Sequence, residues 1–256
     1  MKKQPGRASR NPTLYIESSN LRYVGFHCVQ PNLPLVTAKN MRLLNEIPEF
    51  LYRAFSREKY ARDFIERGHI RIGSIAFYRR IEDEKRRDIT DGVGHIKVRE
   101  LIKSLLITGP KIEENIKPGN LDVETENLNC KYLLCCSDPE VDIALLKKCF
   151  GKYIVKIAEP RRLSDDICNY LEEKHIAFID SPKWIKVNYR KGLLIDKMPS
   201  NNQLAEISYS QKDARFAEDH ECRLVIIMPQ AVSECRKFLM VNLGQRLDYV
   251  VPVGWA

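Results

Sequence analysis

Residues 50–73 constrain the fold more than any other part of the chain, because their pattern changes from strand to helix and back. Residues 50–55 are aromatic and alternate in polarity, which is typical of a strand. Ser56 is then a candidate N-cap, and apolar residues recur at helical spacing until Gly68, a common helix stop. Residues 69–73 alternate again. The segment therefore predicts a strand, a helix and a second strand.

Short apolar runs along the rest of the chain predict more strands than helices. Further strands are expected at residues 97–107, 131–137, 152–157, 176–179, 184–189, 237–241 and 248–253. A helix is expected over residues 163–174, and residues 145–150 are expected to be the end of another helix. Residues 110–129 have the prolines and acids of an exposed loop, and residues 192–207 fit a loop or a short helix. This inventory predicts an α+β fold.

The length of 256 residues suits one large domain or two small ones. Residues 1–12 are polar and basic, and we expect them to be a disordered tail. Residues 13–256 show no internal repeat or linker, so the sequence predicts a single, strand-rich domain of catalytic type.

Apolar runs fall short of the roughly 20 residues that cross a bilayer, and no secretory signal follows the basic start. We therefore expect a cytoplasmic protein without a membrane partner. The eight cysteines are then expected to be thiols. The cluster Cys130, Cys135 and Cys136 contains no CxxC pair, and no second CxxC or HxxxH pair accompanies it in the sequence. We therefore expect no metal site there.

The formal net charge of +8 favours polyanionic partners such as nucleic acids. Common catalytic signatures are missing: the sequence contains no GxSxG, GxxxxGK[ST], GxGxxG or HExxH motif. These absences remove the commonest hydrolase, kinase, dinucleotide-binding and metalloprotease classes. They leave enzymes whose sites come from scattered residues.

Two separated segments carry side chains suited to chemistry. The first contains Arg53 and, further on, a turn rich in aromatic and basic residues. The second contains Asp219, Glu221 and Arg223, which strand alternation would place on one face. Charges on such a face need partners if they are buried. An ion pair between Glu221 and Arg223 at a sheet edge is the structural alternative to a functional site.

Four short motifs resemble a bacterial family long known as a domain of unknown function, which includes abortive phage-resistance proteins of the AbiGi type. In order, the motifs are LYRAFS, GHIRIGSIAFYRRIEDEKRRDITDG, YLLCCSD and KDARFAEDHECR. In that family a tyrosine-containing strand leads to a helix and a short strand. An acidic turn, a Cys-Ser strand and a late K…E.E.R pattern follow. The resemblance is spread over residues 50–228.

That family is similar to the ADP-ribosyltransferase fold, a split β-sandwich with flanking helices, found in nucleic-acid-modifying toxins of the DarT and CmdT type. The resemblance implies that Arg53 binds NAD, that Ser74 or Tyr78 follows it, and that Glu221 completes the site. Asp219 would begin the acid-x-Glu pair of that superfamily. The chain has neither a clean Arg-Ser-Glu nor a clean His-Tyr-Glu signature, so Ser74 and Tyr78 both remain candidates.

The resemblance implies an NAD-dependent ADP-ribosyltransferase, a bacterial toxin or phage-defence effector that modifies RNA or DNA. NAD would be a substrate, and an antitoxin protein is a candidate partner. Glu221 would stabilise the cationic transition state at the ribose. Arg53, together with Arg79 or Arg80, would hold the pyrophosphate, and Tyr78 would stack on nicotinamide.

Two other functions stay open from the sequence. The basic tail and the net charge also fit a non-catalytic nucleic-acid-binding protein or a toxin–antitoxin partner. The acids between Glu82 and Asp91, together with Glu221, would fit a metal-dependent nuclease if they converged on two ions.

Overall fold

A computed structural model describes residues 21–23, 28–29, 47–80, 93–98, 120–127, 129–189, 193–195, 201–231 and 235–255. Its main sheet is antiparallel and has eight strands. They are β3 (Leu51–Phe55), β4 (His69–Ser74), β7 (Asn129–Ser137), β8 (Tyr153–Ile157), β9 (Lys183–Lys186), β11 (Glu221–Ala231), β12 (Phe238–Asn242) and β13 (Val250–Val253). Strands and helices are mixed along the chain, so the predicted α+β class is confirmed.

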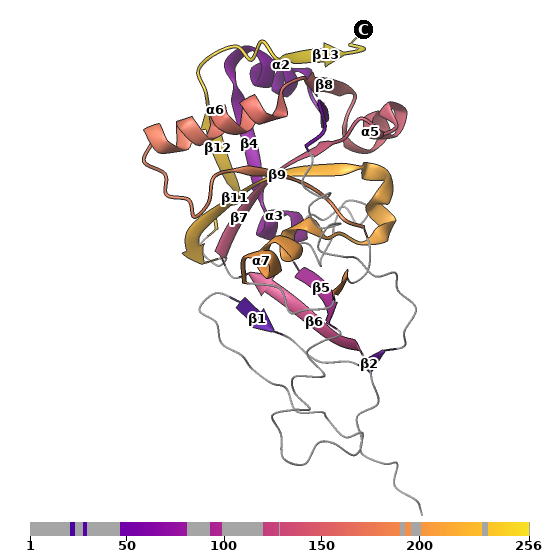
Figure 1. Cartoon of the computed structure of the whole chain (residues 1–256). Helices are drawn as coiled ribbons and strands as arrows, with labels where there is room; N and C mark the ends of the chain where they lie inside the picture. The colour runs from indigo at the N-terminus through magenta and orange to yellow at the C-terminus, as the bar shows by residue number, and fades with distance from the viewer. Residues whose placement is uncertain are drawn as a thin grey trace, which may run out of the picture.

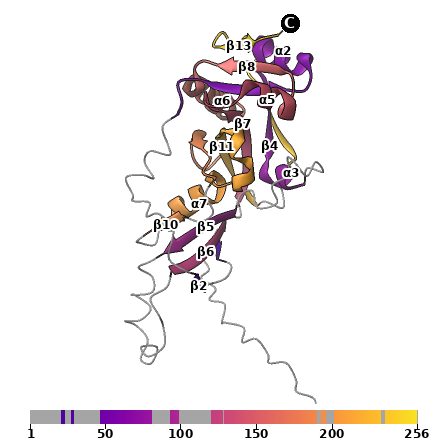
Figure 2. The same ribbon diagram turned by 90° about the vertical axis from the view of Figure 1, so that its right-hand side faces the viewer.

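A second, five-stranded sheet lies beyond the helix α7 (Asn201–Ser210). Its strands are β1 (Leu21–Tyr23), β2 (Cys28–Val29), β5 (Val93–Val98), β6 (Asn120–Asn127) and β10 (Leu193–Ile195). Figures 1 and 2 both show α7 between this sheet and the main one. The smaller sheet therefore stands apart from the strands that carry the candidate residues.

The main sheet splits along β7. One edge of β7 pairs continuously with β11, from Glu221 opposite Ser137 to Met228 opposite Cys130. On the other edge, β4 pairs only with Tyr132 and Leu133, and β3 pairs only with Ser137. On the side away from β7, β4 pairs with β12. In the same way β3 pairs with β8, which in turn pairs with β13. The residues of β7 between the two contacts face a gap in the ladder.

Two amphipathic helices cover one face of this sheet, α2 (Glu58–Arg67) and α6 (Pro160–Glu173). Their apolar sides pack with the even-numbered residues of β7 and β11 in the largest core cluster. Phe64 of α2 and Ile167 of α6 are almost completely buried there. The odd-numbered residues of β7 and β11 point to the opposite face, because side chains alternate along a strand.

Shorter helices lie at the ends of the strands. They are α3 (Ile75–Arg79), α5 (Ile143–Phe150) and the 3-10 helix η1 (Ala214–Asp219). In η1, the Asp213 side chain caps the helix by accepting a hydrogen bond from the Arg215 N–H at 3.0 Å. His220 then takes a left-handed conformation with φ of 46° and turns the chain into β11.

The strand–helix–strand prediction for residues 50–73 is confirmed, and Gly68 ends α2 in the left-handed conformation with φ of 61°. The predicted cap is wrong by one residue. Arg57, and not Ser56, occupies the N-cap position, and its side chain makes no capping hydrogen bond.

Two other expectations also differ from the structure. Residues 120–127, expected in a loop, form β6. The short helix that was one of the two alternatives for residues 192–207 is present as α7, over residues 201–210. Residues 176–179 form no strand, although the Ile179 N–H donates to the Ile227 carbonyl at 2.8 Å. Apolar runs of this length do not reveal whether a neighbouring strand is available for pairing. The basic tail of residues 1–12 lies outside the described residues.

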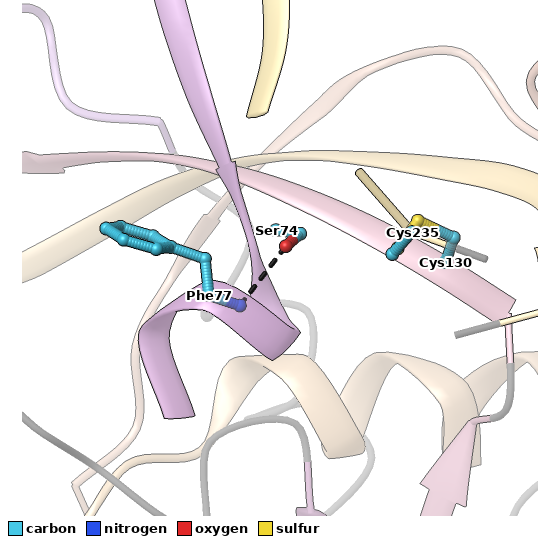
Figure 3. Close-up of a disulfide and its surroundings, with 4 residues drawn as sticks. All are labelled: Ser74, Phe77, Cys130 and Cys235. Carbon is cyan, nitrogen blue, oxygen red and sulfur yellow. Dashed lines mark hydrogen bonds between the residues drawn. A yellow bond between two sulfur atoms is a disulfide. The ribbon is translucent and has the colours of Figure 1, made fainter. Parts of the chain in front are cut away.

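The expectation that all cysteines are thiols is wrong for one pair. Cys130 of β7 and Cys235, just before β12, form a disulfide with their Cα atoms 5.5 Å apart (Figure 3). The two residues are 105 positions apart in sequence, so only the fold brings them within bonding distance. Among the described residues, no helix is long and apolar enough to cross a membrane.

Candidate active site

Most of the predicted residues line one pocket on the face of the main sheet opposite α2 and α6. Arg53, Tyr78, Asp219 and Glu221 all contribute to its wall. The other lining residues are Tyr52, Ala54, Cys135, Cys136, Ser137, Leu146, Phe150, Lys212 and Arg223. The pocket holds about 700 Å³ of empty space, counting the solvent at its mouth.

Glu221 is the most constrained acid of the pocket. It is 5% exposed, and the register of β11 with β7 places it opposite Ser137. One carboxylate oxygen accepts from Arg223 Nε at 2.7 Å, and the other accepts from Lys212 Nζ at 2.7 Å. Burial alone would raise the pKa of Glu221, but the charges of Arg223 and Lys212 outweigh it and hold the pKa below its ordinary value. Glu221 is therefore a fixed anion.

Lys212 joins the two acids of the site. Its Nζ lies 3.0 Å from Asp219 Oδ2 as well as 2.7 Å from Glu221 Oε2, and its side chain is only 10% exposed. Burial lowers the pKa of Lys212, but Glu221 and Asp219 more than compensate and raise it above its ordinary value. Lys212 was not predicted as a site residue. The available signal was the lysine that begins the late K…E.E.R pattern.

Asp219 has the opposite protonation tendency from Glu221. It ends η1 and is not part of β11, so the predicted alternation holds for Glu221 and Arg223 but does not extend to Asp219. Burial raises the pKa of Asp219, and Lys212 offsets this only in part. A carboxylate with a raised pKa is the better proton acceptor of the two.

The Arg53 side chain lies in the gap where β7 is paired with neither β3 nor β4. Its Nη1 donates to the Cys135 carbonyl at 2.9 Å, in the part of β7 that pairs with neither β3 nor β4. Its Nη2 lies 3.4 Å from the Arg71 carbonyl of β4. The Nε atom is buried without a hydrogen-bond partner. Within the described part of the chain the guanidinium pairs with no carboxylate, so its charge remains available to an anion.

Tyr78 reaches the pocket from α3. Its hydroxyl donates to the Leu133 carbonyl at 3.3 Å. Its ring packs against Gly73 so closely that a Cβ atom at that position would lie 2.8 Å from the ring carbons. Burial, followed by the nearby Cys135, raises the pKa of Tyr78 well above its ordinary value. The phenol therefore stays neutral and serves as an apolar wall with one polar end.

Two predicted residues, Ser74 and Arg79, do not line the pocket. The Ser74 hydroxyl caps α3 by accepting from the Phe77 N–H at 3.1 Å, and the residue is 1% exposed (Figure 3). Between the two candidates for the middle position, the fold thus brings Tyr78 to Glu221 and gives Ser74 a capping role. The acids between Glu82 and Asp91 lie outside the described residues.

A second cluster lies beside the pocket, on Asp138, Glu140 and His220. Single ligand atoms from these three residues lie within 4.8 Å of one another, a spacing that could hold a metal ion. Lys186 Nζ already lies 2.7 Å from Asp138 Oδ2 and 3.7 Å from Glu140 Oε2. This ammonium supplies the positive charge that a metal ion would bring, so a cation could bind only after Lys186 moved.

No protein-family model matches the sequence, and comparisons with curated proteins and with solved structures gave no significant match. The chemistry of the pocket must therefore be argued from its own residues.

Proposed function

We propose that the pocket transfers ADP-ribose from NAD to a nucleic-acid acceptor. The observation that carries this proposal is the convergence of Arg53, Tyr78 and Glu221, which come from three distant segments, on one pocket. The residue types suit the donor. An arginine without a carboxylate partner fits a pyrophosphate, an aromatic ring fits nicotinamide, and a fixed carboxylate fits a ribose that becomes cationic.

Glu221 would act as an electrostatic stabiliser and not as a base. Arg223 Nε donates to one carboxylate oxygen and Lys212 Nζ donates to the other. Because each carboxylate oxygen has two lone pairs, the group keeps acceptor capacity for a ribose hydroxyl. Because its pKa is lowered, Glu221 keeps its negative charge through the reaction.

The reaction balances without an oxidant. The bond between the ribose carbon and the nicotinamide nitrogen breaks, and its electron pair leaves with neutral nicotinamide. A nitrogen or oxygen of the acceptor forms the new bond to that carbon and loses a proton. Asp219, whose pKa is raised, would take this proton, with Lys212 holding its carboxylate in place.

A bacterial toxin or phage-defence effector, held in check by an antitoxin protein, would be the setting for such an activity. A non-catalytic nucleic-acid-binding protein or toxin–antitoxin partner is the main alternative, favoured by the net charge of +8. A nuclease that binds metal through Glu221 has less support, because Lys212 and Arg223 already neutralise that carboxylate.

The test is to incubate the protein with labelled NAD and with RNA, DNA or protein, and to measure both nicotinamide release and transferred label. We expect label on nucleic acid, with or without a chelator, and a loss of about 100-fold or more in Glu221→Gln. Glu140→Gln, a change in the neighbouring exposed acid, is the matched control and should keep full activity. A wild-type protein that releases no nicotinamide and labels no acceptor would refute the proposal.

Loss of folding must be separated from loss of chemistry. Glu221→Gln removes the carboxylate that pairs with Arg223 and leaves Lys212 with Asp219, so its thermal unfolding should be recorded beside the wild type. Arg53→Lys supplies a second variant. It keeps a positive charge but lacks the planar fork that spreads the N–H groups of Arg53 between two strands, and it should raise the KM for NAD more than it lowers kcat.

A further inference from the structure

We propose that an exposed face built from β4, α3 and β12 binds single-stranded nucleic acid. The face is marked by the ring pair Phe77 and Phe238, whose centroids lie 4.7 Å apart in an edge-to-face arrangement. The Arg71 guanidinium lies 4.5 Å from the centroid of Phe238. The Lys237 ammonium lies 5.0 Å from Phe77 and 5.4 Å from Phe238. We call these four residues the Phe77–Phe238 face.

The face points away from the core. Ile70 and Ile72 of β4 are buried, so the intervening Arg71 projects from the other side of the strand and is exposed. Arg71 pairs across the sheet with Met240, which is 57% exposed, and Phe238 pairs with Gly73. Figure 2 shows β12 beside β4, with α3 at the end of β4. In Figure 3 the Phe77 ring points away from the disulfide.

The charge on these segments has one sign. Residues 68–80 and 235–246 contain no aspartate or glutamate. Their basic residues are Arg71, Arg79, Arg80, Arg236, Lys237 and Arg246. Within the described part of the chain, Arg71 and Lys237 form no ion pair with a carboxylate. The exposed cations of Arg71 and Lys237 beside the two rings complement a phosphate backbone.

The two rings favour single-stranded over double-stranded nucleic acid. Aromatic side chains that stack on bases need the base faces exposed, and a duplex hides those faces inside its own stack. Phe77 and Phe238 are half-buried, so part of each ring is open to a partner while the packed side holds it in place. Cations beside such rings would bind the phosphates that flank a stacked base. A membrane surface would satisfy the charges but would not explain the paired rings.

The face adjoins the pocket. Arg53, which lines the pocket, contacts the Arg71 carbonyl at 3.4 Å, and Tyr78 follows Phe77 with their ring centroids 5.3 Å apart. A strand bound on the face would therefore place a nucleotide near Glu221. This placement rests on the proposed function, whereas binding itself does not require the reaction.

The experiment measures fluorescence anisotropy of labelled oligothymidine, oligouridine and a matched duplex with the full chain, without NAD. We expect both single strands to bind in a salt-dependent manner, and the duplex to bind more weakly. The double variant Arg71→Glu, Lys237→Glu should weaken binding by about tenfold or more. Phe238→Leu keeps an apolar side chain and should weaken it by about fivefold or more through lost stacking.

Arg161→Glu is the matched control, because Arg161 is exposed on α6, which packs against the other face of the sheet. All variants keep residues 1–12, so a difference between them cannot come from the basic tail. Equal affinities for the double variant and for Arg161→Glu, or a preference for the duplex, would overturn the inference. If the wild type binds the single strands but transfers no label from NAD, the proposed reaction fails and the binding inference stands.

Discussion

The two edges of β7 differ in how completely they are paired. Toward β11, the ladder runs without interruption from Ser137 to Cys130. Toward β4 and β3, only three residues of β7 are paired, and residues 134–136 have no strand partner on this edge within the described part of the chain. The closed edge holds Glu221 and Arg223 in register with Ser137 and Cys135. The open edge leaves backbone carbonyls and space, which Arg53 and the pocket occupy.

The difference shows how one strand can serve both stability and a candidate site. A continuous antiparallel ladder satisfies every backbone group and fixes the side chains that face the pocket. An interrupted ladder needs another donor for each exposed carbonyl, and Arg53 is that donor for Cys135. A long, charged side chain at this point therefore has a structural reason to be present, besides any role toward a ligand.

The largest expected effect comes from breaking the charge pair on the closed edge. Arg223→Met should lower the free energy of unfolding by about 3 kcal/mol, because it leaves Glu221 buried with Lys212 alone. Urea denaturation measures this change. Arg67→Met is the control, since Arg67 pairs with Asp63 at the surface and should cost at most about 1 kcal/mol. Equal losses in the free energy of unfolding for the two variants would show that the buried pair stabilises the fold no more than the surface pair does.

A smaller effect is expected from the open edge. Arg53→Met should cost about 1–3 kcal/mol, because it removes the donor of the Cys135 carbonyl and leaves that acceptor unsatisfied. The same denaturation experiment applies. Arg57→Met is the matched control, because the Arg57 side chain is exposed, lies over the Tyr60 ring and makes no capping hydrogen bond. If Arg53→Met were as stable as Arg57→Met, water would be an adequate donor in the gap.

The smallest expected effect is a dependence of stability on pH, which is flat near neutrality and appears only in acid. The pKa of Glu221 is lowered in the folded state from its ordinary 4.5, so the unfolded chain binds a proton there first as the pH falls. The stability that Glu221 contributes is therefore complete above pH 4.5 and is lost progressively below it. The free energy of unfolding should fall more steeply below this pH in the wild type than in Glu221→Gln.

The comparison of the two proteins isolates Glu221, because every other carboxylate is common to both. Asp219 has the opposite effect on the pH dependence of stability, because its pKa is raised in the folded state. Measuring unfolding at several pH values between neutrality and strong acid tests the sign. Parallel curves for wild type and Glu221→Gln would contradict the strong pairing of Glu221 with Arg223 and Lys212.

The sequence by itself determined the strand–helix–strand unit over residues 50–73, the α+β class and the shared face of Glu221 and Arg223. Local patterns sufficed there, because alternation, helical spacing and a left-handed glycine stop are properties of neighbouring residues. The sequence also indicated Arg53, Tyr78 and Glu221 as candidates, but it could not show that they meet.

Only the tertiary structure decided which residues share the pocket. It brought Tyr78 to the wall and used Ser74 as a helix cap, although both stand in the same motif. It also placed Lys212 between Asp219 and Glu221 through the turn of η1, and it paired Cys130 with Cys235. These outcomes depend on where the sheet splits and where the chain folds back, and such long-range pairing leaves no periodic trace in the sequence.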